Sequence, residues 1–258
     1  MLLIWYVRIT PSSDRAWEPD VAVLAAATVD GDRITITNVR NFEYRSETVF
    51  TPQYYDATYE LSALRSVDMV VSHWSSEAIA HVFLTFGFAD GRYLAISIET
   101  RRARGRPYST LAGFFKHYEL IYVVGDERDL IGLRTDIRRE AVYMYRLQLS
   151  DQARRALFLS YVNQISALHE RPQFYNTLTD NCTTGILRNA NAASHQIDYS
   201  WKVLASGYVD SYAYDIGRLD QGMPFAELKP RSRISRTASD RPGPDFSEQI
   251  RQGLVVGQ

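Results

Sequence analysis

The only cysteine of the chain, Cys182, lies in the polar stretch TDNCTTG. Asp180 and Asn181 are good N-cap residues, so a helix is predicted to begin here with Cys182 in its first turn. There the helix dipole and free backbone N–H groups are expected to lower the thiol pKa and to hold the oxyanion of a tetrahedral intermediate. The alternative is a buried structural cysteine. Such cysteines usually lie in apolar runs, so the polar setting favours a nucleophile.

A second reactive group is predicted from the hairpin formed by HVFLTFGF and RYLAISIE. A three-residue loop, Ala89-Asp90-Gly91, makes one face of this hairpin wholly apolar, whereas a shift of one residue would destroy that face. The same register places His81 opposite Glu99, about 5 Å apart at Cβ. An ordinary cross-strand pair is one interpretation. The other is a general base oriented by a carboxylate, which a cysteine nucleophile would require.

Composition limits the remaining functional classes. The chain has 258 residues, 45% of them hydrophobic, and a net charge of −1. It can bury a substantial core, and nothing in its charge favours nucleic acid as a partner. One cysteine cannot form an internal disulfide, and the five histidines show no metal-binding spacing, so neither a metal nor another cofactor is predicted.

The elements that must position these groups are predicted from hydrophobic periodicity. The patterns indicate a hairpin over 21–39, a polar aromatic loop over 40–60, a short helix running into a strand over 61–72, one further helical turn over 76–80, strands over 118–124, 129–135 and 142–149, and an amphipathic helix over 151–168. The run RRARGRP after the hairpin is typical of a solvated loop. Together the elements predict an α+β fold with an antiparallel sheet.

Both ends differ in composition from the middle. We expect a catalytic domain over 17–228 and, over 229–258, a polar tail without its own core. The apolar start within 1–16 is too short to span a bilayer, which takes about 20 residues. It is read either as a buried first strand or as the end of a membrane anchor.

Five stretches together resemble one bacterial family, the Lnb N-terminal periplasmic domain, named after a lipoprotein intramolecular transacylase. They are NVRNFEYRSE (38–47), IAHVFLTFGFADG (79–91), SIETRR (97–102), YELIYVVGDERDLIGLRT (118–135) and FYNTLTDNCTT (174–184). The resemblance covers roughly residues 17–225. It implies a fold like permuted papain-like (NlpC/P60-type) thiol enzymes, in which the His strand precedes the Cys helix. It also implies a periplasmic domain attached to the cytoplasmic membrane.

The resemblance further implies a lipid-bearing or lipoprotein substrate at the membrane surface. Cys182 would take an acyl chain as a thioester and pass it to an amine, with His81 as base; Glu99 as the third member rests mainly on the register. We expect Asn181 to help hold the oxyanion. The remaining candidates for substrate contacts are Tyr54, Tyr55, Trp74 and Tyr175 in the cleft wall, with Arg45, Arg101 and Arg102 for a glyceryl, phosphate or carboxylate group.

Two alternatives stay open. A papain-like amidase or peptidase acting on cell-wall peptide would use the same residues with water as acceptor, and a polar groove would favour it over an apolar cleft. A periplasmic binding domain without catalysis would have Cys182 fully buried or far from His81. His73, in the loop before the hairpin, is a second candidate base or a substrate contact.

Overall fold

The computed structural model describes residues 9–105, 115–193, 197–236 and 243–254. Its centre is an eight-stranded sheet in the order β1-β2-β9-β8-β7-β6-β10, with β5 also paired to β2. All the pairings are antiparallel except that of β2 with β9. The strands are β1 (Ala26–Asp30), β2 (Arg33–Arg40), β5 (Tyr54–Glu60), β6 (Leu64–Ser76), β7 (Ile79–Phe88), β8 (Tyr93–Arg101), β9 (Glu119–Gly125) and β10 (Ala141–Arg146). The predicted α+β class is thus confirmed.

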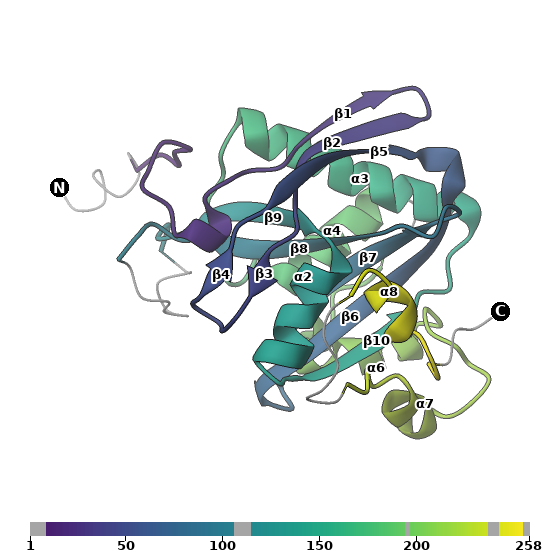
Figure 1. Cartoon of the computed structure of the whole chain (residues 1–258). Helices are drawn as coiled ribbons and strands as arrows, with labels where there is room; N and C mark the ends of the chain where they lie inside the picture. Colours follow the sequence, from purple (N-terminus) through teal and green to yellow (C-terminus); the bar gives the residue numbers. More distant parts are fainter. Residues whose placement is uncertain (1–8, 106–114, 194–196, 237–242, 255–258) are drawn as a thin grey trace.

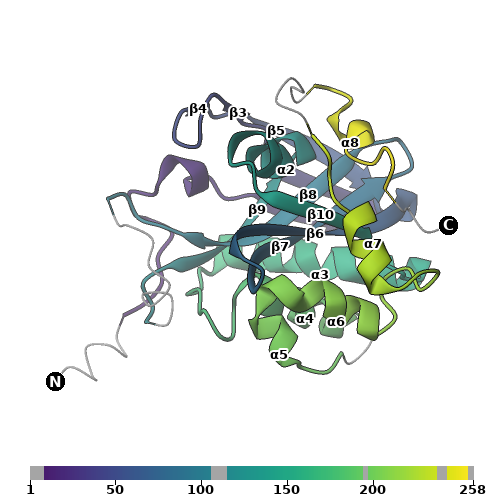
Figure 2. The ribbon, with the colours of Figure 1, turned by 90° about the horizontal axis from the view of Figure 1, so that it is seen from below.

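Helices cover both faces of the sheet, so two apolar layers form (Figures 1 and 2). On one face lie α3 (Asp151–Glu170), α4 (Cys182–Ala193), α5 (Trp201–Leu204) and α6 (Val209–Asp215). The other face carries α2 (Glu127–Gly132) and α8 (Phe246–Gln249), while α7 (Phe225–Arg231) lies near β10. Strands buried on both sides read as continuous apolar runs, as β9 (ELIYVVG) does.

The β7–β8 hairpin has the predicted register. Leu84 pairs with Ile96 and Phe86 pairs with Leu94, and these four side chains belong to the larger core. Gly91 lies in the left-handed region (φ 83°), which closes the three-residue loop. The paired segment ends at Leu84 and Ile96, so the strands are no longer paired where they carry His81 and Glu99.

Other predictions need correction. Residues 129–135 form α2 and then a π-helical segment (Leu133–Ile137) instead of a strand. Acidic residues in the first turn, Glu127 and Asp129, favour a helix start that a short apolar run alone does not reveal. The predicted loop over 40–60 contains β5 and a small hairpin, β3 (Glu43–Tyr44) with β4 (Phe50–Thr51). The predicted helical turn over 76–80 is the turn between β6 and β7.

The C-terminal segment, predicted as a polar tail without its own core, packs two apolar side chains against the sheet. Phe246 and Ile250 are buried in the second apolar layer. Arg251 stacks on Tyr93, 3.6 Å from the ring centroid, and its Nη1 donates to Glu127 at 2.7 Å. Despite its polar composition, this segment thus contributes two buried apolar side chains and one arginine that is 10% exposed.

Most of the N-terminal stretch predicted as a strand or an anchor, residues 1–8, lies outside the described residues. Among the helices in the described ranges, none has the length and apolar character needed to cross a membrane.

Candidate functional site

Cys182, His81 and Glu99 open on one cleft of about 670 Å³. The hairpin supplies two of them, His81 from β7 and Glu99 from β8, and α4 begins with the third. The cleft is also lined by Trp74 and Tyr175, which were predicted to form its wall, and by the charged residues Asp20, Glu47, Arg102, Arg134, Arg138 and Glu140. Three residues far apart in the sequence therefore line one cleft, and half of its other lining residues are charged.

His81 and Glu99 are joined through a serine. The His81 Nε2 to Glu99 Oε1 distance is 3.7 Å, too long for a hydrogen bond. Ser97 lies between them: its Oγ is 2.7 Å from His81 Nε2 and donates to Glu99 Oε1 at 2.8 Å. The only hydroxyl proton of Ser97 goes to Glu99, so Ser97 must accept from Nε2–H. Neutral His81 then has its lone pair on Nδ1, the atom that a general base would use.

Arg134 is one of several groups that keep Glu99 charged. Its side chain is 5% exposed, and its Nη2 lies 3.4 Å from Glu99 Oε1, while Nη1 donates to the Leu130 carbonyl at 2.8 Å. Burial would raise the pKa of Glu99, but His81, Arg134, Arg40 and the Ser97 hydroxyl outweigh it and lower this pKa to about 2. Glu99 is thus an anion at neutral pH.

The same surroundings keep His81 neutral. Burial lowers the pKa of His81 to about 3, with Arg134 and Arg138 adding to the effect and Glu99 opposing it. A neutral imidazole that donates to a serine held by a half-buried carboxylate is arranged to accept a proton at its other nitrogen.

The thiol of Cys182 is also neutral at rest, and this corrects a prediction. Burial raises its pKa, and the negative charge of Glu99 raises it further. The backbone N–H of Val82, on β7, and those of Thr183 and Cys182, at the start of α4, lower the pKa, but they do not outweigh the burial. Cys182 is half-buried and not sealed in the core. No hydrogen bond joins it to His81 among the contacts of the described residues.

Asn181 has a structural role. Its Oδ1 accepts from the backbone N–H of Thr184 at 2.8 Å, and the Thr184 hydroxyl accepts from the Asn181 N–H at 2.9 Å. This reciprocal cap fixes the start of α4. The Asn181 amide donates to the Thr177 carbonyl at 2.8 Å, away from the oxyanion role predicted for it. One turn on, Gly185 lets α4 approach β8 closely, because a Cβ there would lie 2.6 Å from Ile98 Cδ1.

Four predicted contact residues lie outside this cleft. Tyr54 packs edge-on against Phe42, and the Tyr55 hydroxyl donates to Asp126 at 2.7 Å. Arg101 is buried over the Trp17 ring, 4.2 Å from its centroid, and not in a solvated loop. Arg45 lies in the turn between β3 and β4.

Two further predicted candidates have other partners. Arg102 does line the cleft and pairs with Asp20 at 3.1 Å. His73 packs edge-on against Tyr143, and neither of its ring nitrogens is hydrogen-bonded among the described residues. His73 does not line the cleft, which leaves His81 as the candidate base there.

Ser97 and Arg134 were not predicted as site residues. Arg134 lies in the stretch DERDLIGLRT, on the π-helical segment that follows α2. A separate ion pair fixes α2 itself. Arg40 of β2 donates to both carboxylate oxygens of buried Asp129, at 2.9 and 2.8 Å. The sequence signal that could have revealed Arg134 is the set of charged residues spaced through this apolar helical stretch. A charge that such a helix buries usually has a partner, so a partner in the site could have been sought.

The fold and the cleft define a mixed α+β domain with a cysteine, a histidine and a half-buried carboxylate around one opening. The family model of the Lnb N-terminal periplasmic domain matches residues 50–213, more than half of the chain. The chain therefore belongs to this family, as its motifs predicted, and membership supports a periplasmic location. Neither the comparison with curated proteins nor that with solved structures gave a match.

Proposed function

We propose that the chain is a cysteine-dependent acyl-transfer enzyme of the bacterial cell envelope. The observation that carries the proposal is the shared cleft, which Cys182 and His81 both line, with a His81 tautomer that leaves Nδ1 unprotonated and so suits a general base. The order of His81 before Cys182 along the chain agrees with a permuted papain-like arrangement. Attachment to the membrane and a lipoprotein substrate are part of the proposal.

The proposed reaction begins from the neutral pair. His81 Nδ1 takes the Cys182 proton as sulfur attacks an acyl carbonyl, and the N–H groups near Cys182 hold the oxyanion. The tetrahedral intermediate collapses to a thioester, and His81 returns the proton to the departing alcohol or amine. An amine then attacks the thioester, His81 removes its proton, and the thiol re-forms as the amide is released.

A second candidate follows from the charge of the cleft. Seven charged residues line it, including Glu47, Arg138 and Glu140. Such a groove suits a polar peptide better than a bare acyl chain, so an amidase or peptidase on cell-wall peptide, with water as acceptor, is the alternative. Both candidates share the Cys182 acyl-enzyme and differ in donor and acceptor.

The test is to trap the acyl-enzyme. The parent, Cys182→Ser and His81→Ala proteins would each be incubated with a diacylglyceryl lipopeptide or with a cell-wall tetrapeptide and analysed by intact-protein mass spectrometry. We expect a hydroxylamine-sensitive adduct on Cys182 in the parent, reduced at least tenfold in His81→Ala and lost as a thioester in Cys182→Ser. A lyso-lipopeptide product would favour transfer, and a cleaved tetrapeptide would favour hydrolysis.

The rate at which iodoacetamide alkylates Cys182 is an independent measure of whether His81 acts on the thiol. If His81→Ala left the pH profile of alkylation unchanged and neither substrate gave an adduct, a binding domain without catalysis would replace the proposal.

A further inference from the structure

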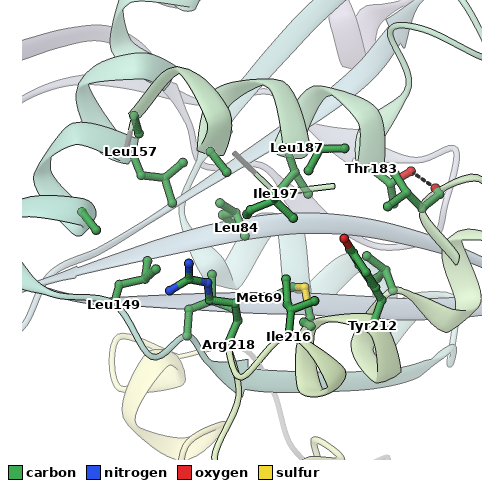
Figure 3. Close-up of a pocket in the computed structure, with 18 of the residues that line it drawn as sticks. Met69, Leu84, Leu149, Leu157, Thr183, Leu187, Ile197, Tyr212, Ile216 and Arg218 are labelled. Carbon is green, nitrogen blue, oxygen red and sulfur yellow. Dashed lines mark hydrogen bonds between the residues drawn. The ribbon is translucent and has the colours of Figure 1, made fainter. Parts of the chain in front are cut away.

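A second cavity, of about 350 Å³, lies between α3, α4 and α6 on the sheet face opposite α2 (Figure 3). One wall is a stripe of α4 made by Thr183, Ile186, Leu187 and Ala190, the spacing of one helix face. Cys182 does not line this cavity and opens on the charged cleft instead. The two hollows thus use neighbouring faces of the same helix.

The walls of this cavity are apolar and reach solvent. Ile186 and Leu187 are half-buried, and Ile216 on the facing side is 38% exposed. Protein interiors normally leave few voids of this size, and the volume lies in the range of small-molecule sites. A methylene group takes about the space of a water molecule, ~30 Å³, so the cavity fits a chain on the order of ten to twelve carbons.

The apolar wall of this cavity includes one positively charged side chain. Arg218 is half-buried and lies between Leu149 and Met69 (Figure 3). Its backbone is fixed by bonds to Ala213 and Gln148. Within the described ranges no carboxylate forms a salt bridge with its guanidinium, although most arginines of comparable burial here have one, such as Arg146 with Asp68. A guanidinium offers five donors and favours an anionic partner with several oxygens.

We propose that this cavity binds a single-chain anionic amphiphile, with the alkyl chain along the α4 stripe and the head group on Arg218. Charge complementarity selects the head group, and the length and apolar lining of the cavity select the chain. A fatty acid and an alkyl phosphate share this chemistry. The proposal does not depend on chemistry at Cys182, because that residue lies outside the cavity wall.

The experiment is displacement of 11-(dansylamino)undecanoate from the full chain, measured by fluorescence below the micelle concentration of each competitor. Dodecanoate and dodecyl phosphate are expected to compete, and their relative affinities distinguish a carboxylate from a phosphate source. Hexanoate, 1-dodecanol and dodecyltrimethylammonium should each bind at least tenfold more weakly. Using Cys182→Ser protein as well separates binding here from any reaction in the cleft.

Two variants locate the ligand. Arg218→Ala should weaken dodecanoate about tenfold, because a hydrogen bond to a charged group is lost, while Arg218→Lys keeps part of the affinity. Ala190→Phe should fill the cavity and weaken all chain ligands. Arg33→Ala, an exposed arginine of β2, is the matched control and should change nothing. The folding of each variant is checked by its thermal transition.

Three results would overturn the proposal: no saturable binding of dodecanoate, equal binding of the cationic amphiphile, or dodecanoate binding that is unchanged in Arg218→Ala or in Ala190→Phe.

Discussion

Replacing Arg134 by methionine should change the pKa of His81 while Cys182, His81 and Glu99 themselves are all kept. Arg134 Nη2 and His81 Nε2 lie 3.4 and 3.7 Å from the same Glu99 oxygen, which places them at most 7.1 Å apart. At an effective dielectric constant of about 20, two unit charges at ~7 Å repel by about 2.4 kcal/mol, which corresponds to roughly 1.7 pKa units. The pKa of His81 should therefore rise from about 3 to about 5 in Arg134→Met.

The assay is an NMR titration of the histidine ring protons, with His81→Asn to identify the signal. Arg134→Lys retains the charge and should keep the pKa of His81 low, and exposed Arg65→Met is the matched control. Loss of Arg134 also removes an ion-pair partner of Glu99, so Arg134→Met should be less stable than the parent. An imidazole titrating near 6.5 in the parent, or one unmoved in Arg134→Met, would refute the reasoning.

The same pKa shift sets a pH dependence of stability. The folded-state pKa of His81 is lower than its ordinary 6.5, so between pH 6.5 and 3 the unfolded chain binds more protons. Stability from this group is fully present above pH 6.5 and is lost as the pH falls toward 3, by about 5 kcal/mol in all. Unfolding in urea across this range should show a flatter profile for His81→Asn.

Three further substitutions test the site and the packing around it. Glu99→Gln removes a charge that raises the pKa of Cys182, so iodoacetamide alkylation at pH 8 should become several-fold faster; a slower reaction would contradict the electrostatics. Asn181→Ala removes the helix cap and should cost about 1 kcal/mol, a fall in the melting temperature of about 2–4 °C, with Asn181→Asp as the conservative control. Gly207→Ala would place a Cβ 1.8 Å from the Glu77 carbonyl, so its soluble yield should fall sharply; a normal melting curve would show that the β6–β7 turn yields.

The hairpin and the start of α4 were predictable because each is determined by nearby residues. A slip of one residue would turn the apolar face of the hairpin to the other side, so the side-chain pattern alone fixes the register. Asn181 likewise marks a helix start through its own side chain. The meeting of His81, Glu99 and Cys182 in one cleft followed from these two local features together with the family motifs.

The missed features depend on tertiary distances. Ser97 bridges His81 and Glu99 because their nearest atoms lie 3.7 Å apart, slightly too far for a direct hydrogen bond. Helix α2 was misread because a short apolar run has no decisive period. The thiol pKa was predicted in the wrong direction because burial and the charge of Glu99 come from the packed sheet, not from the helix that carries Cys182.

Arg40 and Arg251 show that the range matched by the family model is not a complete folding unit. Asp129 and Glu127 are almost wholly buried and lie within the matched range 50–213. Their cationic partners, Arg40 and Arg251, lie before and after it. A chain cut to the matched range would carry two uncompensated negative charges under its sheet, so charge neutrality of the interior requires segments from both ends. The flanking sequence is thus part of the same folding unit.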